Sequence, residues 1–136
     1  MNDGTTRLGT GDLVRRYADA GVRDDFAAME ALRHPDWQEA WPQSGEIITG
    51  NADYRAARTQ RPEGAPRVEL GRIGGSGECW WSEMIVYYAD DSRWLAVTIY
   101  ELRDGLVWRE RIYFGPPVEA PAWRAQWVRR EDPAIS

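Results

Sequence analysis

The chain has 136 residues and carries 17 Lys and Arg against 22 Asp and Glu, so its formal net charge is -5. This length fits one domain, and the lack of clustered Lys and Arg argues against nucleic-acid binding. Cys79 is the only cysteine, which excludes an intrachain disulfide and a cysteine-based zinc site. No stretch of about 18 apolar residues is present to cross a membrane. We therefore expect a cytoplasmic protein that uses no metal and no cofactor.

The first third of the chain predicts two helices. Residues 12–21 place apolar side chains at helical spacing, and Gly21 marks the end of this helix. The apolar stripe consists of Leu13, Val14, Tyr17 and Ala20. A second, shorter helix is expected to begin after a capping Asp24 and to end at Pro35, because proline cannot continue a helix.

The next segment is less regular. Residues 36–50 alternate poorly between apolar and polar side chains and contain Pro42 and Gly45. We expect one or two short strands there, with a loop between them. Residues 52–59 then predict a third helix, with Asn51 as its cap.

The spacing of apolar residues changes from about 3.6 to about 2 after residue 66, as is typical of β-strands. The Asp104-Gly105 pair is a strong signal for a tight turn between two antiparallel strands. Helices first and strands second predict an α+β fold. The expected strands cover residues 67–73, 78–89, 93–103 and 106–114.

Each strand should offer one set of alternate side chains to the interior of the domain. We assign to the interior Trp80, Ser82, Met84, Val86, Ala96, Thr98, Tyr100, Leu102, Trp108, Glu110, Ile112 and Phe114. The opposite set contains Trp81, Ile85, Leu95, Val97 and Ile99. An outer face this apolar predicts a homodimer, because large exposed apolar patches mark interfaces. A reversal of the two faces stays open, and it also predicts a dimer.

Glu110 is a carboxylate on an otherwise apolar strand face, and it is the first candidate for catalysis. A partly desolvated carboxylate has a raised pKa and suits general acid or base work. Tyr17, on the first helix, could donate a hydrogen bond to a ligand carbonyl. The alternative is that Glu110 bonds the Tyr17 hydroxyl and that both residues are structural.

Several aromatic residues are candidates for ligand contact. Trp37 and Trp41 either stack on a flat ligand or plug the cavity mouth. The full predicted ligand-binding set is Trp37, Trp41, Trp80, Met84, Thr98, Tyr100, Trp108, Ile112 and Phe114. Trp123 and Trp127, four residues apart in a tail helix, are expected to fix the tail onto the domain or onto a partner subunit.

His34 is the only histidine. Its place at the end of a predicted helix favours a capping role, since a cation suits a helix C-terminus. Asp36 could instead orient the imidazole for hydrolysis, although no Ser or Cys stands at a defined position to be activated.

The chain resembles the SnoaL-like branch of the nuclear-transport-factor-2-like superfamily. The resemblance covers essentially residues 10–130 and rests on HPDW at 34–37, WPQSG at 41–45, RDG at 103–105 and APAWRAQW at 120–127. It implies a cone-shaped, strongly curved, mostly antiparallel sheet wrapped around N-terminal helices, as in a cystatin-like α+β barrel. An apolar pocket and dimerisation through the outer sheet face are also implied. The expected organisation is a disordered segment at 1–10, one SnoaL-like domain at 11–130 and a tail at 131–136.

Ketosteroid isomerases are the best enzymatic comparison within that superfamily. The resemblance places Tyr17 where the oxyanion-binding phenol belongs. It places Trp41 where the base belongs, and Thr98 or Ile99 where the partner acid belongs. Two of the three catalytic roles are therefore vacant in that arrangement.

Other relatives provide a second comparison. The Asp-Arg-Asp relay of limonene-epoxide-hydrolase-like proteins has no counterpart, because the nearby Arg103-Asp104 pair lies in the hairpin turn. Relatives with a similar tail often carry an Asp where this chain has Ile112. The resemblance thus implies that Glu110 stands without a second acid.

The leading hypothesis is a small-molecule-binding protein that acts without cofactor as an isomerase, cyclase or hydratase on a small apolar or polycyclic compound. Glu110 would move a proton while Tyr17 stabilises negative charge on an oxygen. One alternative is a non-catalytic ligand-binding or assembly dimer. A second is a hydrolase that uses His34 and Asp36.

Overall fold

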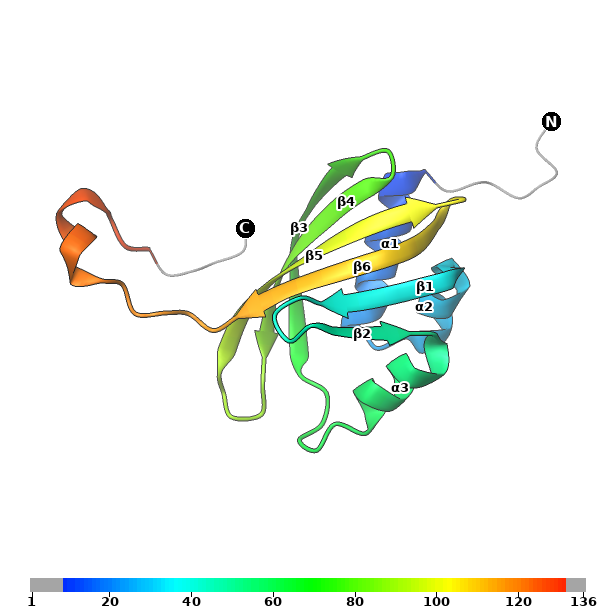
Figure 1. Ribbon diagram of the computed structural model, residues 1–136, viewed down its shortest axis with the longest axis horizontal. Helices are drawn as coiled ribbons and strands as arrows, with labels where there is room; N and C mark the ends of the chain where they lie inside the picture. The colour runs from blue at the N-terminus through cyan, green and yellow to red at the C-terminus, as the bar shows by residue number, and fades with distance from the viewer. Residues whose placement is uncertain (1–8, 132–136) are drawn as a thin grey trace.

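Six strands form one curved, open sheet in the computed structural model, which describes residues 9–131 (Figure 1). The helices are α1 (Thr10–Val22), α2 (Phe26–Leu32), α3 (Asn51–Thr59) and a short 3₁₀ helix, η1 (Ala122–Trp127). The strands are β1 (Arg33–Trp41), β2 (Glu46–Thr49), β3 (Arg67–Ser76), β4 (Cys79–Tyr87), β5 (Arg93–Arg103) and β6 (Leu106–Gly115). Most of the disordered segment expected at 1–10 and of the tail expected at 131–136 lies outside the described residues, but Thr10 already belongs to α1.

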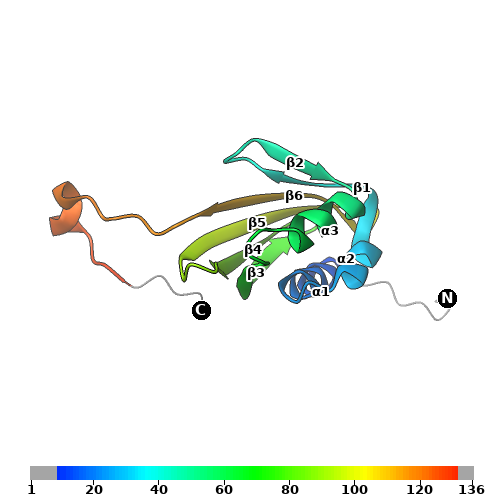
Figure 2. The ribbon, with the colours of Figure 1, turned by 90° about the horizontal axis from the view of Figure 1, so that it is seen from below.

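The strand order is β2-β1-β6-β5-β4-β3, and every neighbouring pair is antiparallel except β1 with β6, which is parallel. The predicted α+β class and curved, mostly antiparallel sheet are confirmed. The sheet does not close into a barrel, because β2 and β3 are edges at its opposite ends. Figure 2 shows α1 and α2 on the concave side of the sheet, where α1 packs against β3 and β4.

The structure corrects the end of the second helix. Helix α2 ends at Leu32, and β1 begins at Arg33, whose backbone is extended. The helical conformation is disfavoured for His34, because this residue directly precedes Pro35. The pairing of β1 with β6 is irregular between Arg33 and Gln38, a stretch that includes Pro35, which has no amide hydrogen to donate. Because α2 ends early, the residues that follow it are free to form β1 at the side of β6.

Two predicted helix caps also shift by one residue. Asp25, and not Asp24, caps α2 through its side chain. Asp24 has a positive φ of 52° and accepts a hydrogen bond from Arg58 of α3 at 2.8 Å. Helix α3 begins at Asn51 itself, after Gly50 at φ 83°. The side chains of Asp24 and Asn51 are therefore used in contacts between elements.

The predicted inner face of the sheet is confirmed on β5. The inward side chains of β5 are at most 4% exposed, namely Ala96, Thr98, Tyr100 and Leu102. Leu95 and Val97, on the opposite face, are 37% and 38% exposed. The two faces are therefore not reversed, although Ile85, assigned outward, is buried.

Trp108 is an exception on the neighbouring strand. The pairing of β5 with β6 is irregular next to it, which reverses the alternation at this point. Val107, which strict alternation with Trp108 and Glu110 would place on the outer face, is fully buried. Trp108 instead packs beneath the guanidinium groups of Arg103 and Arg109, which lie 4.9 and 4.0 Å from a Trp108 ring centre. A single irregularity thus moves one large aromatic side chain off the inner face.

Candidate active site

A cavity of about 230 Å³ lies between the inner face of the sheet, α1 and α3. Eight of the eleven residues that the sequence assigns to the site line its wall. They are Tyr17, Trp41, Met84, Thr98, Tyr100, Glu110, Ile112 and Phe114. The wall also contains Glu39 and Arg58, which the sequence did not single out.

The other three predicted contact residues, all tryptophans, do not line this cavity. Trp37 is buried and does not line the cavity, but its indole N–H donates a hydrogen bond to Glu110, which does. Trp80 packs against the hydrophobic core and donates to the Gly77 carbonyl at 3.0 Å. Trp108 lies on the outer side, for the reason given above.

Glu110 lies at the centre of a buried polar network. Its side chain is on the inner face of β6, and the residue is only 5% exposed. The Tyr17 hydroxyl donates to Glu110 Oε2 at 2.5 Å, and Trp37 Nε1 donates to the same oxygen at 2.6 Å. Both donors favour the ionised form of the carboxyl group. The Glu110–Tyr17 bond that the sequence left as an alternative is therefore present.

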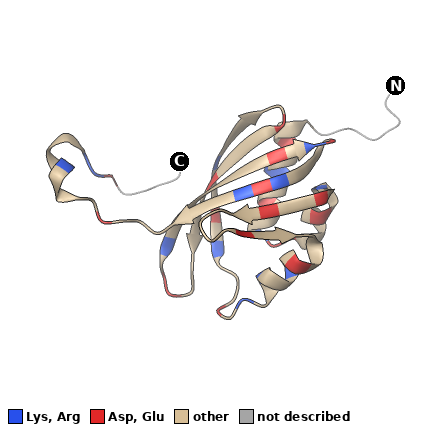
Figure 3. Cartoon of the chain, in the orientation of Figure 1, with Lys and Arg blue, Asp and Glu red and all other residues tan. Residues whose placement is uncertain are grey.

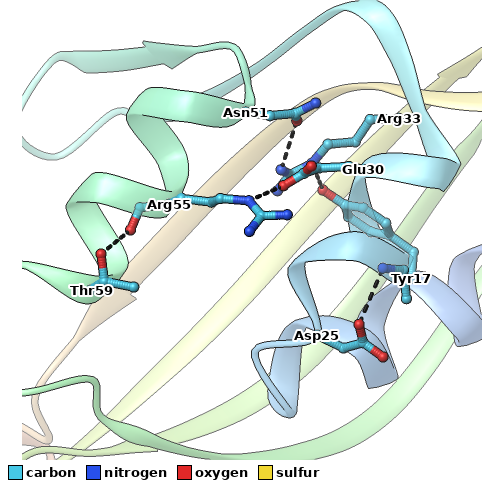
Figure 4. A network of polar contacts seen from close by, with 8 residues as sticks. Tyr17, Asp25, Glu30, Arg33, Asn51, Arg55 and Thr59 are labelled. Atoms are coloured by element: carbon cyan, nitrogen blue, oxygen red, sulfur yellow. Dashed lines mark hydrogen bonds and ion pairs between the residues drawn. The ribbon is translucent and has the colours of Figure 1, made fainter.

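Arg33 supplies a buried positive charge beside this network. Its Nε donates to the Tyr17 hydroxyl at 2.6 Å, and its Nη1 donates to Asn51 Oδ1 at 3.2 Å (Figure 4). The guanidinium carbon lies 3.6 Å from a Trp37 ring centre and 4.2 Å from that of Tyr54, close enough for cation–π attraction. Arg33 Nη2 has no hydrogen-bond partner among residues 9–131. The cation is therefore held largely by aromatic faces, with Tyr17 between it and Glu110.

Glu39 is a second buried carboxyl group, and it corrects the expectation that Glu110 stands alone. It lies on β1 as the register partner of Glu110 on β6, and it is 4% exposed. Adjacent strands are about 4.8 Å apart, so the two residues are direct neighbours. Trp41 Nε1 donates to Glu39 Oε2 at 2.9 Å. Because Glu39 also lines the cavity, the site contains a pair of carboxyl groups.

The two carboxyl groups differ in how readily they ionise. Burial and, after it, the charge of Glu110 raise the pKa of Glu39 to about 8. Burial also raises the pKa of Glu110, but Tyr17, Arg33 and Trp37 oppose that rise. We infer that Glu110 loses its proton first and that Glu39 keeps one at neutral pH, the two titrating as a coupled pair.

Tyr17 and Tyr100 complete the polar wall as neutral groups. Burial raises the pKa of both phenols above the usual value, and the charge of Glu110 adds to the shift. The Tyr100 hydroxyl shares a hydrogen bond of 2.8 Å with Ser82, which is fully buried. Both phenols are therefore suited to hydrogen bonding and not to acting as bases.

One signal in the sequence could have identified Glu39. Trp37, Glu39 and Trp41 are spaced by two, so they share one face of a strand. The poor alternation of residues 36–50 as a whole concealed this short regular stretch. The parallel pairing with β6, about 70 residues later in the chain, could not be inferred from local spacing.

The acid pair stands at other positions than the ketosteroid isomerase comparison implied. Trp41 and Thr98, at the positions of the base and partner acid, both line the cavity. The carboxyl groups come instead from Glu39, two residues before Trp41, and from Glu110 on β6. A carboxyl pair is thus present in the same cavity but is arranged differently.

His34 and Asp36 do not form the arrangement that hydrolysis would need. His34 Nε2 lies 3.3 Å from Asp104 Oδ2 in the β5–β6 turn. The His34 ring accepts a hydrogen bond from the backbone amide of Asp36 at 3.0 Å, so the Asp36 carboxylate does not orient it. Neither residue lines the cavity.

Features that would indicate other kinds of site are not found in the described part of the chain. Residues 9–131 contain no group of three or more His, Cys, Asp or Glu side chains that could hold a metal ion. None of the described helices is long and apolar enough to cross a membrane. Figure 3 shows charges of both signs interspersed over the strands and helices in that view.

Comparisons with known proteins agree with this fold. The SnoaL-like domain profile matches residues 14–110. An NTF-2-like protein of unknown function from Burkholderia xenovorans is 35% identical, with 90% of this chain and 95% of that chain covered and a TM-score of 0.77. A proposed ketosteroid isomerase from Kribbella flavida is 27% identical, with 93% and 92% covered and a TM-score of 0.82.

A more distant solved structure shares the fold alone. It is a proposed SnoaL-like polyketide cyclase from Jannaschia, 17% identical, with 83% of this chain and 91% of that chain covered and a TM-score of 0.63. No curated protein matches the sequence.

Proposed function

The chain belongs to the SnoaL-like domain family, and on that premise we propose that it is a cofactor-independent enzyme that moves a proton within a small apolar substrate. The observation that carries the proposal is the pair of buried carboxyl groups, Glu39 and Glu110, in one cavity. Two such groups with different ionisation supply a base and an acid at the same pH. The similarity to a proposed ketosteroid isomerase supports isomerisation as the reaction type, with cyclisation as its closest relative.

In the proposed reaction, Glu110 is the base and Glu39 is the acid. Both hydrogen bonds to Glu110 use Oε2, which leaves Oε1 to take a proton from a carbon next to a substrate carbonyl. The electron pair of the broken C–H bond moves onto the carbonyl oxygen. The protonated Glu39 donates a hydrogen bond or its proton to that oxygen. Return of the proton from Glu110 to another carbon completes an isomerisation.

Tyr17 has a supporting role in this reaction. Its hydroxyl donates to Glu110 while Glu110 is ionised. Once Glu110 has taken up the substrate proton, its demand for that hydrogen bond falls, and the Tyr17 hydroxyl can turn to the developing oxyanion. The proposal thus keeps the charge-stabilising role expected for Tyr17 and assigns it to a later step.

The cavity favours a substrate with one or two rings. Its volume of about 230 Å³ is below the roughly 300–1,000 Å³ of typical drug-sized sites. Much of the wall away from the acid pair is apolar, and Met84, Ile112 and Phe114 are part of it. A compact ketone whose carbonyl reaches Glu39 and whose rings contact these side chains fits this distribution.

Solvent-exchange chemistry tests the proposal without knowledge of the natural substrate. Bicyclic β,γ-unsaturated ketones are incubated with the protein in D₂O, and both deuterium uptake and enone formation are followed by NMR. We expect uptake that falls by about 10³-fold in Glu110→Gln and in Glu39→Gln, as for the loss of a general acid or base. Uptake by the native chain no faster than by either variant would refute the assignment.

A non-catalytic binding protein is the second candidate, and one observation favours it. The Tyr17 and Trp37 donors are already satisfied by Glu110, as they would be in a purely structural network. This candidate predicts that the same ketones quench tryptophan fluorescence and are recovered without deuterium. The two candidates are therefore separated by a single mass measurement on the recovered ligand.

A homodimer is part of the proposal. Four large side chains on the outer face of the sheet, or at its margin, are 36–44% exposed, namely Trp81, Leu95, Val97 and Tyr113. Burial of such a row between two copies would remove apolar surface from water. The cytoplasmic location stays a prediction that rests on the cysteine content.

A further inference from the structure

The last described residues form an arm whose large apolar side chains are exposed. Residues 116–131, here called the C-terminal arm, leave the end of β6 and extend away from the rest of the domain in both Figure 1 and Figure 2. The arm contains the 3₁₀ helix η1. Val118 is 82% exposed, Trp123 is 72% exposed and Trp127 is 71% exposed. The arm therefore does not cover its own domain, which removes one of the two uses predicted for these tryptophans.

Two solvent-exposed tryptophans on one short helix indicate a missing partner. Each indole carries a large apolar surface, and tryptophan is the residue type most enriched at the energetic centres of protein interfaces. Trp123 and Trp127 lie at the two ends of η1, and the nearby Val128 is 47% exposed. The arm thus presents several apolar side chains at once, as a docking segment does.

A matching apolar groove lies on the outer face of the sheet. Leu95 and Val97 of β5 and Tyr113 of β6 form its floor, and they are 37–44% exposed. Val97 and Tyr113 are cross-strand partners. Gln43 and Pro116 border the groove, so the arm begins at the edge of the groove and then leads away from it.

We propose that the arm docks in the outer-face groove of a second copy of this chain, with Trp123 and Trp127 against Leu95, Val97 and Tyr113. This inference rests on the dimer through the outer sheet faces proposed above. Within that dimer it assigns the cover of Leu95, Val97 and Tyr113 to the partner's arm and not to the partner's sheet. In a two-fold dimer each arm would cover the partner's groove, so the contact would be made twice.

Length and charge favour this occupant. Sixteen residues can span at most about 50 Å, more than the roughly 33 Å of a ten-residue strand, so the arm can cross a partner's sheet. The arm carries three Arg and two Glu, whereas the whole chain has a net charge of -5. A weakly basic arm is therefore attracted to the acidic body of another copy.

The first test measures the dimer in solution. We expect the full-length chain to sediment as a dimer, and the double variant Trp123→Ser, Trp127→Ser to raise the dissociation constant at least about 30-fold, as for the loss of interface hot spots. Ile47→Ser is the matched control, since Ile47 is 60% exposed on β2 and lies outside both the arm and the groove. An unchanged dissociation constant in the double variant would overturn the proposal.

The second test identifies the contact. Subunits with Gln126→Cys are mixed with subunits with Val97→Cys, both in a Cys79→Ser background, and are oxidised after subunit exchange. A covalent dimer is expected from this mixture but not when Ile47→Cys replaces Val97→Cys. A cross-link confined to a single chain that carries both Gln126→Cys and Val97→Cys would show that the arm folds back, against the proposal.

The remaining outcomes separate this inference from the proposed function. A native dimer that forms no Gln126–Val97 cross-link would support the paired outer faces and refute the docking of the arm. A monomeric native chain would refute both the paired faces and the docked arm, and it would have no bearing on the ketone exchange assay. A blue shift of tryptophan fluorescence with anionic phospholipid vesicles, lost in the double tryptophan variant, would assign the arm to a lipid surface and overturn the proposal.

Discussion

Glu39 and Glu110 are neighbours with nearly equal burial but unlike surroundings. Their residues are 4% and 5% exposed, and they face each other across the parallel pair of β1 and β6. Glu110 receives two hydrogen bonds to one oxygen, with Arg33 behind one of the donors. Glu39 receives one, from Trp41. Burial raises the pKa of both groups. The charge of Glu110 adds to the rise for Glu39, whereas the Tyr17 and Trp37 donors and Arg33 oppose the rise for Glu110.

The two environments also have different origins along the chain. The partners of Glu110 come from α1 and from β1, so they depend on the tertiary fold. The partner of Glu39 is two residues away on the same strand. An ionised carboxylate at this depth therefore requires several elements to meet, whereas a protonated one needs only a local contact.

The largest effect is expected from Glu110→Gln, which removes the ionised member of the pair. Deuterium uptake by the ketone probes should fall about 10³-fold, equivalent to about 4 kcal/mol of transition-state stabilisation. Glu101→Gln is the control, since Glu101 pairs with Arg111 at 2.7 Å outside the cavity. Comparable losses in both variants would mean that the effect is not specific to the site.

Arg33→Met should give the next largest effect, on stability. The variant leaves Glu110 without its nearby cation and removes a guanidinium group stacked on Trp37. Loss of one member of a buried charge network costs about 3 kcal/mol. Urea unfolding monitored by circular dichroism measures this. Arg55→Met, which breaks an exposed pair with Glu30, should cost less than about 1 kcal/mol.

Glu39→Gln should change how stability depends on pH. The pKa of Glu39 is raised in the folded state to about 8, so the folded chain holds a proton that the unfolded chain releases above its ordinary pKa of 4.5. Stability of the native chain should therefore fall as pH rises from about 4.5 to about 8. The neutral Gln avoids this loss, so the stability of the variant relative to the native chain should increase by about 3 kcal/mol between pH 5 and pH 8.

The measurement is urea unfolding at pH 5 and pH 8 for both chains. A wider gap between the chains at pH 8 than at pH 5 is the expected result. A constant gap would show that Glu39 is ionised across this range, and it would remove the proposed acid from the mechanism.

Much of the fold could be predicted because its signals are local. The β5–β6 hairpin follows from the Asp104-Gly105 turn and the alternation on either side of it. The stripe of α1 follows from helical spacing, and its residues are buried as expected. Glu110 and Tyr17 could be found for the same reason, since each is a polar group on an apolar face.

The remaining part of the site depends on contacts that local spacing does not encode. Arg33 was assigned to the end of a helix, and only the shift to an extended backbone places it beside Tyr17. Glu39 becomes significant only through its parallel pairing with Glu110. Trp108 was assigned to the wrong face, because the irregular pairing beside it cannot be recognised from the alternation of apolar and polar residues in the sequence.

Tyr17→Phe is the smallest of these changes and tests how the difference between the carboxyl groups is made. Loss of its hydrogen bonds to Glu110 and Arg33 should cost about 2 kcal/mol of stability, because both partners are charged. It should also raise the pKa of Glu110, so the acidic limb of the pH–rate profile for ketone exchange should move to higher pH. Tyr100→Phe is the matched control, because its buried hydroxyl bonds Ser82 and not Glu110. A shift of equal size in both variants would mean that the limb reports the cavity as a whole, whereas a shift in Tyr17→Phe alone would show that the Tyr17 hydroxyl helps to keep Glu110 ionised.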